Sequence, residues 1–77
     1  MAAKYTRPSA ALPHRTERIT LTHRAIKSGV RVYAVGSDPT KPQLVRTAKD
    51  FGSFREAMAF MDAKGEAFEA QGFTRVR

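Results

Sequence analysis

The sequence contains no cysteine, which limits the ways in which so small a chain can be stabilised. Without thiols, neither a disulfide bond nor a thiolate metal site can form. The two histidines, His14 and His23, are too few for a structural metal site unless several carboxylates surround them. We therefore expect no metal and no cofactor, and the lack of cysteine agrees with a reducing compartment. Self-association, as a homodimer for example, is the remaining way to reinforce the fold.

Long apolar runs are also missing. No stretch approaches the roughly 18–20 apolar residues that a membrane-spanning helix needs. The N-terminal segment is basic and rich in small residues, but it lacks the continuous apolar block of a signal peptide. We therefore expect a cytoplasmic protein without membrane contact. The 77 residues suffice for one domain with a modest core.

Signatures of catalysis are absent as well. The sequence has neither the GxGxxG nor the GxxxxGK[ST] phosphate-binding motif. Three carboxylates share one flank of the predicted helix, where such groups are usually solvated: Asp62, Glu66 and Glu69. His23 has the same strand parity as Leu21, which indicates a packed histidine rather than a catalytic base. We expect a binding protein and no enzyme.

What the chain does have is positive charge, with 14 Lys and Arg residues against seven Asp and Glu residues. The charge is uneven, because residues 1–49 hold ten basic and two acidic side chains. Residues 50–77 hold four basic and five acidic ones. Such asymmetry is typical of a surface that binds polyanions. The alternative interpretation is a basic protein whose charge serves solubility alone.

Residues 1–16 show no hydrophobic period and contain two prolines, Pro8 and Pro13. A segment of this kind buries too little apolar surface to offset the entropy of ordering it. We therefore interpret it as a flexible basic N-terminal arm. Basic arms occur in DNA-binding domains, where they track a groove, but a disordered tail without a role fits the composition equally well.

Two runs of alternating residues follow the arm. Ile19 and Leu21 alternate with polar residues, and Val30 and Val32 do the same. The turn signal Lys27-Ser28-Gly29 separates the two runs, and Gly29 can adopt a positive φ. Two alternating runs joined by so short a turn predict an antiparallel hairpin.

A third strand is predicted over residues 43–49, after a loop with two prolines at 37–42. Its phase is ambiguous, because Leu44 and Val45 cannot face the same side of a sheet. We expect it to pair antiparallel to the second strand of the hairpin.

A helix is predicted next, beginning with a capping box in which Ser53 is the N-cap and Glu56 the third helical residue. An apolar stripe follows at helical spacing: Phe54, Met58, Met61, Gly65 and Phe68. Gly65 indicates either a close approach to a strand, which we favour, or a break in the helix. Gly72 stands where a left-handed C-terminal cap is expected.

The order of these elements predicts an α+β domain over residues 17–77. Its architecture would be a three-stranded antiparallel sheet with one C-terminal helix packed on one face. Residues 73–77 would form either a short fourth strand or an irregular end. The opposite face of the sheet is then left to water or to a partner.

The uncovered sheet face would present the polar residues of the alternating runs: Thr20, Thr22, Arg24, Arg31 and Tyr33, with Arg46 if Val45 faces inward. Guanidinium groups suit phosphate oxygens and guanine edges, and a tyrosine ring can stack on a base. Exposed Arg and Thr are also common on small sheets for solubility alone. The candidate nucleic-acid-binding residues are Arg15, Arg18, Arg24, Lys27, Arg31, Tyr33 and Arg46.

The third strand and the following segment FGSFREAMAFMDAKG resemble the arm-site DNA-binding domains of tyrosine recombinases. In that family an aromatic residue, a polar residue and an EA dipeptide open the helix, and the sheet enters the major groove. The second half, through EAQGF, also resembles the end of WGR domains, which associate with DNA, although the WGR tripeptide is missing. Both resemblances imply that the sheet contacts DNA.

We expect a small nucleic-acid-binding accessory or regulatory protein that uses the open sheet face and the N-terminal arm. Double-stranded DNA is favoured, because a single tyrosine is not the aromatic platform with which proteins bind single-stranded RNA. The alternative is a small phage- or plasmid-type protein that binds the acidic surface of a host protein. Phe60, which lies off the main helical stripe, fits such a contact or a peripheral core position.

Overall fold

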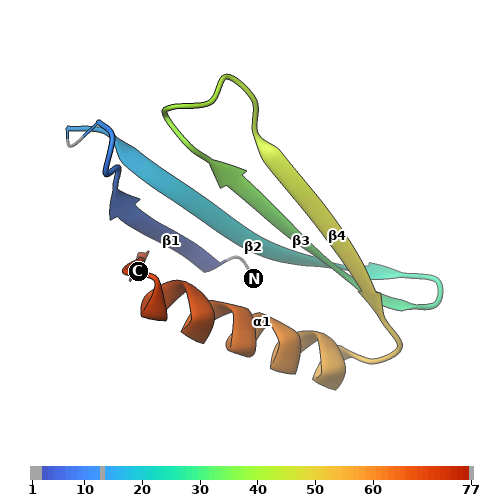
Figure 1. Ribbon diagram of the computed structural model, residues 1–77. Coiled ribbons are helices and arrows are strands. Elements are labelled where there is room, and N and C mark those ends of the chain that lie inside the picture. Colours follow the sequence, from blue (N-terminus) through green and yellow to red (C-terminus); the bar gives the residue numbers. More distant parts are fainter. Residues whose placement is uncertain (1–2, 13, 77) are drawn as a thin grey trace.

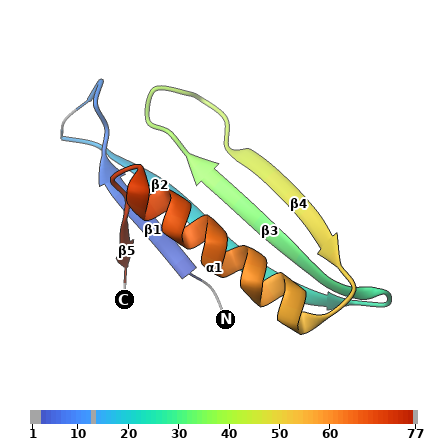
Figure 2. The ribbon, with the colours of Figure 1, turned by 60° about the horizontal axis from the view of Figure 1, so that its bottom comes forward.

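The computed structural model describes residues 3–12 and 14–76, which form one sheet and one helix (Figure 1). In chain order the elements are β1 (Ala3–Pro8), β2 (Thr16–Ile26), β3 (Gly29–Ser37), β4 (Val45–Phe51), α1 (Phe54–Ala70) and β5 (Thr74–Val76). All neighbouring strands are antiparallel. Their order across the sheet is β4-β3-β2-β1-β5, so the first and last strands of the chain lie side by side (Figure 2).

The predicted class, α+β with a C-terminal helix packed on one face of an antiparallel sheet, is confirmed. The predicted number of strands is wrong, because the sheet has five strands and not three or four. The strand expected over residues 43–49 is β4, which starts and ends two residues later. The end of the chain supplies β5, and the strand that the sequence did not predict is β1.

Strand β1 contradicts the interpretation of residues 1–16 as a flexible arm, of which residues 1, 2 and 13 lie outside the described part of the chain. It pairs with β2 over six positions and with β5 over three. Tyr5 is 4% exposed and packs with Leu21 and Phe73 in the core. Pro8 is compatible with this strand because β5 pairs only with residues 4–6, so β1 has a free edge at Pro8.

The predicted hairpin is confirmed as β2 and β3, which pair over nine positions. Lys27 and Ser28 form the turn between them. Gly29 has a φ of 149°, which residues with a side chain rarely adopt. A Cβ atom on Gly29 would also collide with the backbone carbonyl of Phe51 in β4. Glycine is thus required by the turn and by the approach of the next strand.

Both ends of α1 follow the prediction. The Oγ of Ser53 accepts a hydrogen bond from the Glu56 amide at 3.2 Å. At the other end, Gly72 has a φ of 95°, and the Phe73 amide donates to the Phe68 carbonyl at 3.0 Å. The two phenyl rings lie 6.0 Å apart between centroids. These contacts form a Schellman motif with its usual hydrophobic contact, which directs the chain into β5.

The face of α1 that packs on the sheet contains Ala57, Met61 and Gly65. A Cβ atom on Gly65 would overlap the hydroxyl of Tyr5 and lie 3.2 Å from Tyr5 Cζ. Close approach to a strand therefore explains this glycine, as favoured, and the strand is β1. Phe54, the first residue of α1, also faces the sheet, where its ring meets that of His23 at 5.4 Å, but it stays 57% exposed at the end of the helix.

The core consists of two clusters that Met61 joins. The buried residues of the first are Tyr5, Leu21 and Phe73, and those of the second are Val30, Val32 and Ala57. The helix begins against β3 and β4 and ends against β1 and β5, while the far ends of β3 and β4 extend past it (Figures 1 and 2). An open groove therefore remains between α1 and β4.

Candidate nucleic-acid interface

In the described part of the chain no helix covers the sheet face opposite α1, and the strand register decides which side chains this face carries. Leu21, Val30 and Val32 are buried on the helix side, so the residues that alternate with them point to the other side. Following these positions across the paired strands defines the open face: Lys4, Thr6, Pro8, Thr16, Arg18, Thr20, Thr22, Arg24, Ile26, Gly29, Arg31, Tyr33, Val35, Ser37, Arg46, Ala48, Asp50, Thr74 and Val76.

The open face carries five basic residues and one acidic residue. The carboxylate of Asp50 accepts two hydrogen bonds from Arg31, from Nε at 2.6 Å and from Nη2 at 3.0 Å. Within residues 3–12 and 14–76, the only other ion pair is Arg7–Glu17. The remaining basic residues of the open face have no carboxylate partner in this part of the chain: Lys4, Arg18, Arg24 and Arg46.

The Arg31–Asp50 pair perturbs both of its members. The Asp50 hydrogen bond, with a smaller contribution from Tyr33, raises the pKa of Arg31 above its ordinary value. In return, the guanidinium lowers the pKa of the Asp50 carboxyl. The pair is solvent-exposed, so it contributes little stability, but its two-point contact orients the Arg31 fork.

A row of charged residues crosses three strands near the hairpin end of the open face. Arg24 of β2 pairs with Arg31 of β3, which in turn pairs with Asp50 of β4. Tyr33 lies in the next row, between Thr22 and Ala48. Tyr33 is the one aromatic residue of the open face, and both of its neighbours have small side chains. Cationic groups and an aromatic ring therefore lie about 7 Å apart along the strand, the repeat of two residues in a β-strand.

The structure brings most predicted site residues together. Arg24, Arg31, Tyr33 and Arg46 share the open face, as the alternation predicts, and the register adds Arg18 to the same face. Arg18 and Arg24 are six residues apart on β2, which corresponds to about 20 Å along the strand. Their face is thus long enough for several phosphate groups.

The other two predicted site residues, Arg15 and Lys27, lie at opposite ends of β2. Lys27 is exposed in the turn of the hairpin. Arg15 is exposed in the connection between β1 and β2, where its amide donates to the Leu12 carbonyl at 2.8 Å. Its carbonyl accepts from the Ser9 amide at 2.9 Å. Arg15 therefore belongs to a folded loop, which corrects the placement of this residue in a flexible arm.

Sequence reasoning missed Lys4, which joins the open face through β1 opposite Thr20. The signal was present in the alternation of residues 3–6, where Ala3 and Tyr5 face the helix side. A strand of mixed polarity is hard to distinguish from a polar tail unless its partners are known.

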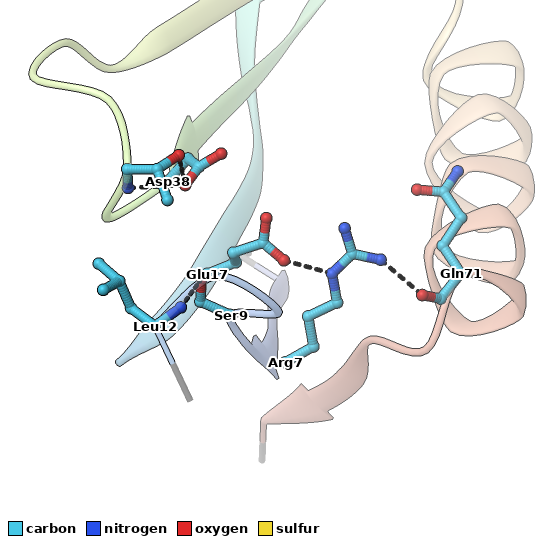
Figure 3. A network of polar contacts seen from close by, with 7 residues as sticks. Arg7, Ser9, Leu12, Glu17, Asp38 and Gln71 are labelled. Atoms are coloured by element: carbon cyan, nitrogen blue, oxygen red, sulfur yellow. Dashed lines mark hydrogen bonds and ion pairs between the residues drawn. The ribbon is translucent and has the colours of Figure 1, made fainter. Parts of the chain in front are cut away.

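Arg7, by contrast, serves the fold. It lies on the helix side, where Nε donates to the carboxylate of Glu17 and Nη1 donates to the Gln71 carbonyl at 2.6 Å (Figure 3). Its guanidinium carbon stands 4.3 Å from the centroid of the Phe73 ring. One side chain thus connects β1, β2 and the end of α1, and Arg7 is not part of the open face.

A second surface feature lies on the helix side, where the groove between α1 and the β3–β4 pair has a volume of about 530 Å³. Its apolar lining includes Val45 and Phe60. The ammonium groups of Lys49 and Lys64 lie 5.2 and 5.6 Å from the centre of the Phe60 ring. Phe60 also packs on Phe51, at 5.0 Å between centroids, so it has the role of a peripheral core residue.

His23 lies on the helix side, where its ring meets Phe54 edge-on at 5.4 Å, in agreement with a packed histidine. Its Nδ1 is buried and makes no hydrogen bond with any described residue. The described residues contain no group of three or more His, Asp or Glu side chains that would hold a metal ion.

Over the residues described, α1 is too short and too polar to cross a lipid bilayer. Comparison with known proteins adds no assignment to this geometry. No protein-family model matches the sequence, and neither curated proteins nor solved structures gave a significant match. The open face and the groove are therefore the two surfaces from which a function can be inferred.

Proposed function

We propose that this chain binds nucleic acid, with duplex DNA as the favoured form, through its open face and the β2–β3 hairpin. The observation that carries the proposal is the charge of the open face, where five basic residues stand against a single carboxylate. Four of the seven acidic residues of the chain lie on α1, which packs on the opposite side of the sheet. A polyanion approaching the open face would therefore meet most of the basic groups and few of the acidic ones.

The dimensions of the sheet suggest how a duplex would be contacted. Five strands spaced about 4.8 Å apart span about 19 Å, whereas the major groove of B-DNA is about 12 Å wide. The whole sheet is too wide to enter the groove, but a two-stranded ribbon fits it. Beyond the Ala3–Leu21 pair the sheet narrows to β2, β3 and β4, about 10 Å across, so this end fits the groove with Lys27 at its tip and Arg24 and Arg31 behind it.

Each basic group has a distinct part in this proposal. Arg24 has no carboxylate partner among the described residues, so its fork is available for phosphate oxygens or a guanine edge. Arg31 is already oriented by Asp50, which reduces the entropy lost on binding but offsets part of its charge. Arg18, Arg46 and Lys4 lie farther along the sheet, where they would contact the phosphate backbone.

A fluorescence-anisotropy titration against duplex DNA, single-stranded DNA and RNA at several salt concentrations tests the proposal. Neutralising about four phosphates predicts a slope near −4 in a plot of log K against log salt, or roughly 10²-fold weaker binding between 50 and 200 mM salt. Arg24→Ala and Arg46→Ala should each weaken binding and make the slope shallower by about one. Arg55→Ala, on the exposed side of α1, is the matched control and should leave binding unchanged. Binding that does not depend on salt would refute the proposal.

A second candidate function, docking on an acidic surface of another protein, is supported by the groove. Its apolar lining and its two lysines, Lys49 and Lys64, suit a segment with apolar and acidic side chains. Phe60→Ala should weaken such binding and leave DNA binding intact, provided that circular dichroism shows the fold to be retained. Pull-down from lysate with and without nuclease distinguishes the two functions, because nuclease removes only partners held through nucleic acid.

A further inference from the structure

We propose that two copies of this chain associate through β4 to form a continuous ten-stranded sheet, with Ala48 on the two-fold axis. The inference is independent of the proposed nucleic-acid binding. It depends on the position of β4 at the edge of the sheet, on the direction of its free backbone groups and on the order of its side chains.

Strand β4 is the long unpaired edge of the sheet. It runs over seven residues, whereas the opposite edge, β5, has three. Six of the seven residues are exposed, and apolar side chains stand at its start: Leu44 is 51% and Val45 57% exposed. Natural proteins usually shorten, bend or cover such an edge, because its free N–H and C=O groups can pair with another strand.

The backbone of β4 is oriented for this pairing. The carbonyl oxygens of Val45 and Phe51 lie toward β3, each near one of its glycines. Backbone groups alternate in direction along a strand, so those of Arg46, Ala48 and Asp50 point to the free edge. Ala48 is the middle residue of β4, and its outward N–H and C=O groups would bond reciprocally to the same groups of the second copy.

The side chains of β4 are complementary to themselves in this register. With Ala48 opposite its own copy, Arg46 stands opposite Asp50 of the second copy, and the reverse pair forms on the other side of the axis. On the helix side, Val45 stands opposite Phe51. Opposite charges and apolar pairs directly across an antiparallel pair are both stabilising. Because Asp50 already accepts from Arg31, it would then lie between two arginines.

Neighbouring registers lack this complementarity. Moving the axis to Lys49 places two lysines opposite each other, a repulsive pair. Moving it to Thr47 places Lys49 opposite Val45 and Arg46 opposite Ala48, so no charged residue finds a partner. The Ala48 register is thus the one of the three that pairs both charges and apolar residues. Charged side chains that only kept other strands away from a free edge would not need to be complementary to one another across a two-fold axis.

Sedimentation or light scattering on nuclease-treated protein, over a wide range of concentration, provides the first test. The mass should rise from 8.6 kDa to twice that value as concentration increases. Arg46→Asp alone and Asp50→Arg alone should each raise the dimer Kd at least about tenfold, because two attractive cross-strand pairs become repulsive in each. A wild-type protein that stays monomeric at every concentration would overturn the proposal.

Mixing the two variants tests the register itself. In the heterodimer of Arg46→Asp and Asp50→Arg, both cross-strand pairs are again of opposite charge, so the equimolar mixture should dimerise more tightly than either variant alone. If both variants keep the circular dichroism of the wild type and the mixture shows no recovery, this register is wrong. Because the protein is nuclease-treated, tighter dimerisation of the mixture would not depend on the proposed nucleic-acid binding.

Crosslinking gives a readout that does not depend on the charge variants. The chain has no cysteine, so Ala48→Cys introduces a single thiol, placed on the proposed axis. A short bis-maleimide should convert this variant to a covalent dimer. Ala59→Cys, exposed on α1, is the matched control and should stay monomeric under the same conditions. Equal crosslinking of the two variants would contradict the proposed interface.

Discussion

The contact between Gly65 and Tyr5 predicts a measurable coupling between the helix and the N-terminal strand. Replacing glycine by alanine inside a helix normally stabilises a protein by about 1 kcal/mol. At Gly65 the added methyl group would overlap the Tyr5 hydroxyl, and overpacking of this kind costs about 1–3 kcal/mol. We therefore expect Gly65→Ala to lower the free energy of unfolding by about 1 kcal/mol, the difference between the two effects.

Tyr5→Phe should change the sign of this effect. Without the hydroxyl, the closest atom of the ring to a Cβ on Gly65 is Cζ, at 3.2 Å, which a small shift can accommodate. In the Tyr5→Phe background, Gly65→Ala should then be neutral or stabilising. The double-mutant cycle should give a coupling free energy of at least about 1 kcal/mol.

Urea denaturation followed by circular dichroism measures all four proteins of the cycle. Ala63→Gly, on the exposed side of α1, isolates the helix propensity and should destabilise both backgrounds equally, by about 1 kcal/mol. The reasoning fails if Gly65→Ala has the same effect with Tyr5 and with Phe at that position. That outcome would mean that β1 does not lie against the helix as described.

Three further predictions concern the ends of α1 and the acid response. Arg7→Ala should destabilise the fold by about 1–2 kcal/mol in urea denaturation, because it removes the charged hydrogen bonds to Glu17 and to the end of α1. Arg7→Lys should recover little of this loss, because lysine lacks the forked guanidinium that makes both bonds. Gly72→Ala should cost about 1 kcal/mol in the same assay, because its φ of 95° is unfavourable for a residue with a side chain. The pKa of Asp50 is lowered in the folded state, so its contribution to stability is present above the unfolded pKa of about 3.9 and is lost as the pH falls through the folded pKa. The melting temperature of Asp50→Asn should therefore fall slightly less than that of the wild type on acidification, and an NMR titration that gives Asp50 an ordinary pKa would show that the Arg31 contact is not formed.

The parts of the fold that the sequence predicted are those that local interactions determine. The hairpin depends on alternation and on Gly29, and the helix ends depend on Ser53 and Gly72, all within a few residues of their partners. The open-face placement of Arg24 and Arg31 followed directly, because parity within a hairpin fixes which residues share a face.

The main failure, strand β1, depends partly on residues distant in sequence. Strand β1 pairs with β2, which follows it in the chain, but its other contacts are with β5 and, through Tyr5, with Gly65, and local composition does not reveal them. Its absence from the prediction also removed Lys4 from the candidate site. The shifted bounds of β4 have a different cause. This edge strand is exposed over most of its length, so burial imposes no alternation from which its bounds could be located.

The position of β1 between β2 and β5 also has a consequence for folding on the ribosome. Strands β1 to β4 can pair as soon as they emerge, because each is adjacent in sequence to the next. Tyr5, however, faces Gly65 on the helix and Arg75 across the sheet, which are synthesised 60 and 70 residues later. Leu21 therefore stays exposed in the nascent sheet until the helix and β5 have been synthesised. Such delayed long-range closure slows folding and makes the partly made chain a candidate for chaperone binding.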